Sequence, residues 1–318
     1  MNAPAPAGAA VRVEALVKRF PGVAAVDGLG FEVARGEIFG LVGPDGAGKT
    51  TTLRMLAATM RPDSGRVEVD GVDVLAEPEQ AKHRVSYMPQ RFGLYEDLTV
   101  DENIRFFAEL FEVPKPAWRA RADRLLEASG MLPFRRRLAG QLSGGMKQKL
   151  GLTCALVHAP RVLLLDEPTT GVDPVSRREF WQILYGLRAE GVAMLISTAY
   201  LDEAERCDRL ALLHGGRMLH SDTPRRLKAL LPGAILRVSS ARPREVARCL
   251  EGREGVLGTL LAGDGVDLHV DDAARRRPEV LAALAAAGLP AEEIVRVEPS
   301  IEDLFVALLE RQAPAPTP

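Results

Sequence analysis

The chain has 318 residues and a formal net charge of −2 at pH 7, and 47% of its residues are apolar while 26% are charged. This composition is typical of a soluble globular protein, and the length allows one large domain and a small one. The balanced charge gives no reason to expect a nucleic-acid partner, because such a partner requires a basic stripe.

The three cysteines, Cys154, Cys207 and Cys249, are far apart and lack metal-ligand spacing, so we expect buried thiols in a reducing compartment. The first residues lack a basic region followed by an apolar core. We therefore interpret 1–10 as a disordered leader and not as a signal peptide. No run of about 18 apolar residues occurs, so any membrane role must come through a partner.

Residues 11–230 alternate between short apolar runs and stretches of helical spacing, which predicts a layered α/β domain. The runs at 37–43, 161–168 and 192–198 are typical of strands buried on both faces of a sheet. The segment from about 92 to 155 contains amphipathic helices and is predicted to be a helical subdomain inserted in this domain.

Residues 234–310 read as strand, helix, strand, strand, helix and strand. That order predicts a small α+β accessory domain that is ferredoxin-like. A final helix follows, with Ser300 as its candidate N-cap. The Pro-rich tail 311–318 is expected to be disordered.

The segment "GPDGAGKT" fits G-x-x-x-x-G-K-[ST] between a predicted strand and a predicted helix. Glycines allow backbone N–H groups to surround phosphate oxygens, and the helix N-terminus adds a positive dipole end. Lys49 would reach the β- and γ-phosphates, and the Thr50 hydroxyl would bind Mg²⁺. The predicted nucleotide-binding residues are Gly43, Pro44, Asp45, Gly46, Ala47, Gly48, Lys49, Thr50 and Thr51.

Two further motifs carry chemistry. "RVLLLDEP" delivers Asp166 to the end of an apolar strand, where it can hold Mg²⁺ through water. Glu167 follows and is free to orient or deprotonate an attacking water. In "QLSGGMKQKLGL", a serine and two glycines open a helix and form a second anion site, which makes sense if it serves a nucleotide held by another molecule.

These motifs resemble those of the ATP-binding cassette (ABC) ATPases, and "LSGGM" resembles the signature of that family. Phe20 resembles the aromatic residue that stacks on adenine. Gln90 resembles the glutamine that contacts Mg²⁺ and water and links the site to a permease. Asp173 in "GVDP" resembles the loop that crosses the dimer interface.

The resemblance implies an α/β P-loop NTPase fold over 11–230, with ATP and Mg²⁺ as cofactors. Lys49, Gln90 and Glu167 would be catalytic, and Thr50, Gln90 and Asp166 would hold the metal. Two cassettes, identical or different, would pack head to tail. Ser143, Gly144 and Gly145 of one would then serve the nucleotide of the other.

The resemblance also narrows the transporter type. "STAYLDEAERCDRLALLHGGR" and the C-terminal piece resemble exporters of drugs, antibiotics or lipid-like compounds. The permease would be a separate transmembrane subunit, and this chain would lie on the cytoplasmic face of the cell membrane through it. The segment 91–103 would contact the coupling helix of the permease. The alternatives are an ATP-binding regulatory subunit in a heterodimer and a soluble ABC ATPase of translation or DNA repair.

The chain departs from the family pattern at two positions. Asp45 stands where many relatives have Asn. Ala199 stands where the family usually has a histidine that donates a hydrogen bond to the γ-phosphate, and loss of such a donor typically costs about 10²–10³ in rate. A shift of one residue would let the Tyr200 hydroxyl replace it. We expect nucleotide binding to remain and hydrolysis at this chain's own site to be slow.

Overall fold

The computed structural model describes residues 8–91, 93–263, 265–289 and 291–312. The chain forms two compact units, Met1–Ser221 and Asp222–Pro318, which divide a little before the expected boundary at 230–234. The first strand begins at Ala9, inside the segment expected to be a disordered leader. Residues 1–7 of that leader and 313–318 of the expected tail lie outside the described residues.

A six-stranded sheet forms the centre of the N-terminal unit, in the order β10-β9-β3-β8-β7-β6. β3 runs parallel to β8 and β9, and β7 runs parallel to β6 and β8. The expected doubly buried strands are therefore confirmed as β3, β7 and β8. The strands are β3 (Ile38–Val42), β6 (Val85–Met88), β7 (Val162–Asp166), β8 (Ala193–Thr198), β9 (Arg209–His214) and β10 (Arg217–Asp222).

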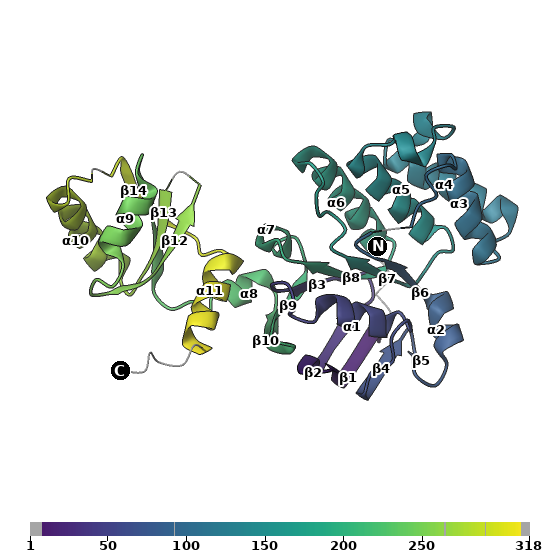
Figure 1. The fold of residues 1–318 in the computed structure, drawn as a ribbon, viewed down its shortest axis with the longest axis horizontal. Helices are drawn as coiled ribbons and strands as arrows, with labels where there is room; N and C mark the ends of the chain where they lie inside the picture. Colours follow the sequence, from purple (N-terminus) through teal and green to yellow (C-terminus); the bar gives the residue numbers. More distant parts are fainter. Residues whose placement is uncertain (1–7, 92, 264, 290, 313–318) are drawn as a thin grey trace, which may run out of the picture. The chain divides into compact units, whose positions relative to one another are not determined.

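Two layers cover the faces of this sheet (Figure 1). Alternate residues of one strand enter different cores, so that Phe39 and Leu41 of β3 pack in one and Ile38 packs in the other. The first core contains α1 (Lys49–Leu56) and a sheet in the order β2-β1-β4-β5. The second contains α5 (Gly144–Leu156) and α6 (Pro174–Ala189). The remaining elements here are β1 (Ala9–Phe20), β2 (Val23–Ala34), β4 (Ser64–Val69), β5 (Val72–Asp73), α2 (Pro78–Arg84) and α7 (Leu201–Ala204).

The predicted helical subdomain consists of α3 (Val100–Leu110), α4 (Lys115–Ala128) and α5, with short 3₁₀ turns at Leu132–Phe134 and Ala139–Gln141. Thr99 and Glu102 form a reciprocal capping box that starts α3. The buried Val100, Ile104 and Leu126 belong to a core of its own.

The C-terminal unit has an antiparallel sheet in the order β12-β13-β11-β14. With α9 and α10 as crossovers, this order confirms the ferredoxin-like prediction. The Ser300 hydroxyl accepts a hydrogen bond from the Asp303 amide at 3.1 Å and caps the last helix. The elements are α8 (Pro224–Lys228), β11 (Ala234–Ser239), α9 (Pro243–Leu250), β12 (Val256–Ala262), β13 (Gly265–Val270), α10 (Ala273–Ala286), β14 (Glu293–Val297) and α11 (Ile301–Gln312).

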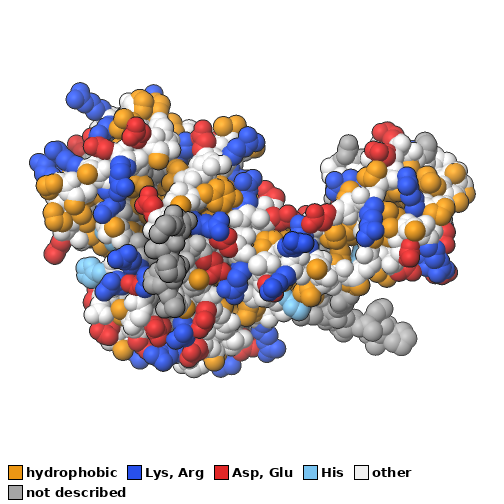
Figure 2. All heavy atoms as spheres, turned by 180° about the vertical axis from the view of Figure 1, so that it is seen from behind, with side chains coloured by type: hydrophobic (Ala, Val, Ile, Leu, Met, Phe, Trp, Pro, Cys, Tyr) orange, Lys and Arg blue, Asp and Glu red, His pale blue; other side chains and the backbone are white. Residues whose placement is uncertain are grey.

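Charges of both signs are interspersed over the face of the N-terminal unit seen in Figure 2. Within the described ranges, no helix is long and apolar enough to cross a membrane.

Gly145 lies where α5 approaches α6 closely. A Cβ on Gly145 would stand 2.5 Å from the Ser176 Cβ, whereas one on Gly144 would meet nothing within 4 Å. We expect Gly145→Ala to destabilise the N-terminal unit by about 1–3 kcal/mol through overpacking. Gly144→Ala, the matched control, should change stability by at most about 1 kcal/mol. Calorimetric unfolding measures both, and equal transition temperatures would contradict this packing.

His158 provides a test of pH dependence. Its ring stacks on Phe111 with centroids 3.9 Å apart, and burial lowers its pKa to about 4. His158 therefore binds a proton more readily in the unfolded chain than in the folded one. Its contribution to the free energy of unfolding is fully present above about pH 6.5. That contribution is lost as the pH falls towards 4, which lowers the free energy of unfolding by up to about 3 kcal/mol. His158→Phe should lose this dependence. His220→Phe, which changes an exposed histidine, should keep the pH dependence of the unmodified chain. Urea unfolding of both variants between pH 7 and 4 measures the difference, and an equal dependence in both would contradict the role of His158.

Candidate nucleotide-binding site

The loop Gly43–Thr50 joins β3 to α1, as the motif requires. Gly46 and Gly48 have φ values of 79° and 97°, which favour glycine. A Cβ on Gly43 would stand 2.3 Å from the carbonyl oxygen of Leu213, and one on Gly48 would stand 2.3 Å from that of Ala25. The loop therefore needs glycine at Gly43 for space and at Gly48 for both space and backbone conformation.

Lys49 lies buried across this loop, with 4% of its surface exposed. Its Nζ donates hydrogen bonds to the carbonyl oxygens of Gly43 at 2.7 Å and Pro44 at 3.1 Å. The same Nζ lies 3.3 Å from Glu167 Oε1. The structure thus brings the predicted phosphate-binding lysine into contact with the predicted base.

Asp166 receives three hydroxyl hydrogen bonds. Thr50 Oγ1 and Ser197 Oγ donate to Oδ1 at 2.8 and 2.7 Å, and the Tyr87 hydroxyl donates to Oδ2 at 3.0 Å. Burial, followed by the charge of Asp166, raises the pKa of Tyr87 to about 12, so Tyr87 remains a donor. Thr50 and Asp166 were both predicted to hold the metal, and the structure brings them into contact. Tyr87 and Ser197 were missed, although a serine near the end of the apolar run "VAMLIST" was a usable signal.

Glu167 turns away from Asp166 because its backbone has a φ of 47°. Its N–H donates to Ser197 Oγ at 2.9 Å, which holds the turn. Gln90 Nε2 donates to Glu167 Oε2 at 3.1 Å. A positive φ is uncommon for a residue other than glycine and is frequent at functional sites. The turn therefore aims the two adjacent carboxylates at different partners.

The donor set fits a magnesium ion. Mg²⁺ prefers oxygen ligands and is usually held by one or two protein groups together with phosphate and water. The Thr50 hydroxyl and the Asp166 carboxylate supply such oxygens at one point, and Gln90 reaches the neighbouring Glu167.

Ser143 and Asp173 are the N-caps of α5 and α6. Ser143 Oγ accepts a hydrogen bond from the Met146 amide at 3.3 Å. Asp173 Oδ1 accepts from the amides of Val175 at 3.0 Å and Ser176 at 2.9 Å, and hydrogen bonds from Ser176 lower the pKa of Asp173. Because Gly145 packs on Ser176, the signature segment and the Asp173 loop form one cluster. In the described part of the chain, no backbone–backbone hydrogen bond joins this cluster to the phosphate loop.

Phe20 ends β1 with 43% of its surface exposed, and Lys18 Nζ lies 5.8 Å from its ring centroid. An exposed ring is available for stacking on a base, as the resemblance implies. Asp45 is exposed within the phosphate loop.

Ala199 follows β8 directly and is exposed. The ring of Tyr200 lies 4.8 Å from the guanidinium of Arg177 on α6. The Tyr200 amide donates to Thr198 Oγ1 at 2.9 Å, which fixes this turn. The structure therefore holds Tyr200 towards α6, and its replacement of the histidine stays a prediction.

Known proteins resemble this chain in sequence. Residues 26–170 match the family described as ABC transporter. The chain is 44% identical to the probable multidrug ABC transporter ATP-binding protein YbhF of Escherichia coli, over 95% of this chain and 52% of that one. It is 36% identical to the daunorubicin resistance ATP-binding protein DrrA3 of Streptomyces coeruleorubidus, over 95% and 96% of the two chains. The chain thus spans about half the length of YbhF and nearly all of DrrA3.

Solved structures share the fold. An ATP-binding subunit of an ABC transporter aligns with a TM-score of 0.64 at 29% identity, over 69% of this chain and 92% of that one. The protein cbiO1 from Clostridium perfringens aligns with a TM-score of 0.64 at 25% identity, over 77% and 96% of the chains. With the phosphate loop, the Asp-Glu pair and the signature in one cassette, the chain belongs to the family of ABC transporter ATP-binding proteins.

Proposed function

We propose that this chain is the ATP-binding and ATP-hydrolysing motor subunit of an ABC exporter. The observation that carries the proposal is the convergence of Lys49, Glu167 and Gln90 beside the Thr50–Asp166 pair. These groups provide a phosphate cation, a water-orienting carboxylate and a metal site within a few ångströms. That combination suits phosphoryl transfer, which depends on positioning and charge stabilisation.

The residues divide the work as follows. The loop amides and Lys49 bind and neutralise the phosphates, while the exposed ring of Phe20 stacks on the base. Thr50 and Asp166 hold the ion that, when bound, neutralises charge developing on the phosphates. Glu167 orients the attacking water and accepts its proton, and Gln90 fixes the Glu167 carboxylate through the bond to Oε2.

A second cassette completes the site in this proposal. The Ser143 hydroxyl and the glycines of the signature form a helix N-terminus suited to phosphate. The Ser143 hydroxyl accepts from the Met146 amide, and among the described residues no backbone–backbone hydrogen bond joins the signature to this chain's own phosphate loop. We therefore assign Ser143, Gly144 and Gly145 to the nucleotide of the partner cassette, with Asp173 at the interface.

The cargo and the permease follow from the relatives. YbhF is named for multidrug transport and DrrA3 for daunorubicin resistance, which supports export of drugs or antibiotics. Lipid-like compounds stay in the proposal from the sequence resemblance alone. We propose a separate transmembrane permease that places this chain on the cytoplasmic face of the membrane.

Ala199 favours an asymmetric assembly. Its methyl group cannot donate the hydrogen bond that the family histidine supplies, so this chain's own site is slow. A partner cassette that has the histidine would then form a competent site with Ser143 of this chain. The regulatory-subunit alternative is the extreme form of this arrangement, in which this chain's own site does not turn over.

The hydrolytic site can be tested with two variants. Glu167→Gln should lower ATP turnover by about 10²–10⁴ and leave nucleotide binding intact, because it removes the base. Ala199→His should raise turnover of the isolated chain by about 10²–10³. Phosphate release and binding of a fluorescent ATP analogue give the two readouts.

Tyr200→Phe is the matched control, because it removes only the hydroxyl. If Tyr200→Phe lowers turnover and Ala199→His raises it little, Tyr200 already supplies the donor. Brisk turnover by the unmodified chain, with no effect of any variant, would refute the slow-site hypothesis and point to another base.

Coupling to the permease can be tested at the 91–103 segment. Glu96 Oε1 lies 2.7 Å from Lys147 Nζ on α5, and the Glu96 carbonyl oxygen accepts a hydrogen bond from Gly140 at 3.0 Å. Glu96→Lys should therefore uncouple the segment from the signature helix by like-charge repulsion. We expect permease stimulation of ATP turnover to fall, and the exchanged pair Glu96→Lys/Lys147→Glu to restore it. Full stimulation in the single variant would contradict the coupling role.

A further inference from the structure

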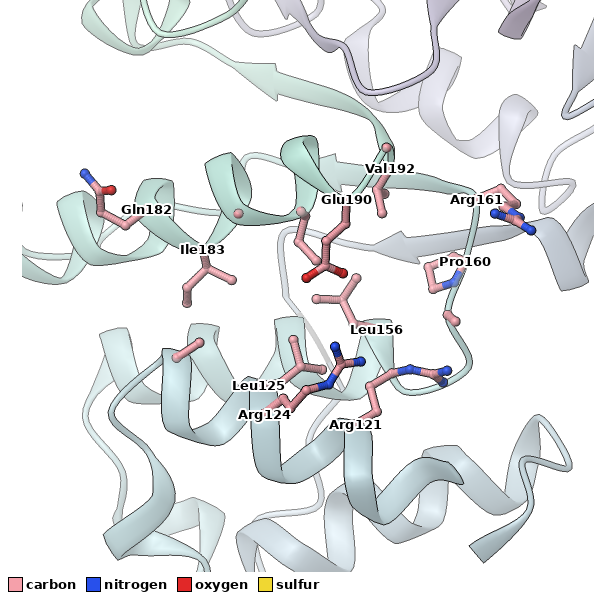
Figure 3. A pocket seen from close by; sticks show the side chains of 15 residues that line it. Arg121, Arg124, Leu125, Leu156, Pro160, Arg161, Gln182, Ile183, Glu190 and Val192 are labelled. Atoms are coloured by element: carbon pink, nitrogen blue, oxygen red, sulfur yellow. The ribbon is translucent and has the colours of Figure 1, made fainter. Parts of the chain in front are cut away.

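A pocket of about 610 Å³ lies in the N-terminal unit, away from the phosphate loop. It is bounded by α4 on one side, by α6 on the other, and by the end of α5 (Figure 3). Arg161 and Val192, at its edge, immediately precede β7 and β8. The phosphate loop and Asp166 lie at the opposite, carboxyl ends of the parallel strands. This pocket is therefore a separate site.

The pocket has an apolar floor. Leu156 and Leu187 belong to the core between the sheet and α6, and Leu125, Ile183 and Val192 pack against it. Ligand pockets for small molecules are typically about 300–1,000 Å³, largely apolar and equipped with a few polar groups. The size and the floor therefore match a small molecule with a hydrocarbon body.

The edge of the pocket is cationic. It contains Arg121, Arg124 and Arg161 against one carboxylate, Glu190. Figure 3 shows Arg124 and Glu190 reaching towards the space from opposite sides, with Leu125 and Leu156 between them. Among the residues that the structure describes, none of the three arginines forms a salt bridge.

The positive charge here is poorly compensated. Burial, followed by the neighbouring Arg124, lowers the pKa of Arg121, and the charge of Glu190 offsets this only in part. Nη1 of Arg121 donates a hydrogen bond to the Val157 carbonyl oxygen. This bond fixes the side chain at the pocket but does not neutralise the charge of the guanidinium. An anion that entered would relieve this repulsion and gain charge-assisted hydrogen bonds.

We propose that this pocket binds an apolar organic anion. Its carboxylate contacts Arg121 and Arg124, and its hydrocarbon body lies on Leu125, Leu156 and Ile183. Such a ligand would bridge α4 of the helical subdomain and α6 of the core. The proposal goes beyond the ATPase and uses no property of the phosphate site.

Calorimetric titration of the full chain with decanoate, and with decan-1-ol as the uncharged match, tests this directly. We expect saturable binding of decanoate near one per chain, and at least tenfold weaker binding of decan-1-ol. Arg121→Gln/Arg124→Gln should weaken decanoate binding at least tenfold, because it removes both donors of charge-assisted hydrogen bonds. Arg178→Gln, at an exposed position of α6 outside the pocket, should bind as the unmodified chain does.

Gly186→Leu gives a second variant. Gly186 lines the pocket within α6, and a Cβ there would meet nothing within 4 Å, so the side chain fills the pocket without a clash. Leucine also favours helix over glycine, so the fold should be retained. Decanoate binding should disappear. Equal binding of decanoate and decan-1-ol, unchanged binding to Gly186→Leu, or no decanoate binding at all would overturn the proposal. A further result would overturn it: Gly186→Leu fails to co-purify with the permease, while the unmodified chain does not bind decanoate. That result would assign the pocket to contact with a protein.

Discussion

The buried carboxylate of Asp166 is the constraint on which the site depends. Only 2% of Asp166 is exposed, and a buried charge is costly unless it is hydrogen-bonded. The donors are three neutral hydroxyls, from Thr50, Ser197 and Tyr87. Because none of them carries a positive charge, the carboxylate stays satisfied without losing its attraction for a divalent cation. The same three bonds join α1, β6 and β8 to β7 at one point.

In the mechanism we propose, Lys49 links phosphate binding to the state of Glu167 as the base. An ammonium group has three donors, and Lys49 directs them at two loop carbonyls and at Glu167. A phosphate that approaches Lys49 competes with Glu167 for the same charge. Release from Lys49 leaves Glu167 held by Gln90, which comes from the strand–loop connection towards the helical subdomain. In that mechanism, phosphate binding would break the Lys49–Glu167 ion pair and so free Glu167 to act as the base.

The phosphate loop and the Asp-Glu pair could be predicted from the sequence because local sterics determine them. Gly43 and Gly48 have no space for a side chain, so the motif itself specifies the structure. Tyr87 and Ser197 could not be assigned in the same way, because their contacts with Asp166 depend on how parallel strands are aligned. Ser197 faces Asp166 through the β7–β8 register. The Glu96–Lys147 bond and the Arg121 pocket depend on helix packing across many residues, which no local pattern reveals.

The turn after β8 carries Tyr200, whose hydroxyl is predicted to replace the missing imidazole if the turn shifts by one residue. Tyr200 is held on the half-buried Arg177 by a cation–π contact, and such contacts are worth about 0.5–2 kcal/mol as burial increases. A positioned donor at a developing negative charge is worth roughly 3–4 kcal/mol. The contact that holds Tyr200 on α6 is thus weaker than the gain from moving its hydroxyl to the phosphate. The backbone of the turn opposes this movement. The fully buried Glu203 accepts a hydrogen bond from the Thr198 hydroxyl at 3.1 Å, and the same hydroxyl accepts one from the Tyr200 amide. In the slow-site hypothesis, this anchor therefore controls whether the Tyr200 hydroxyl can reach the γ-phosphate.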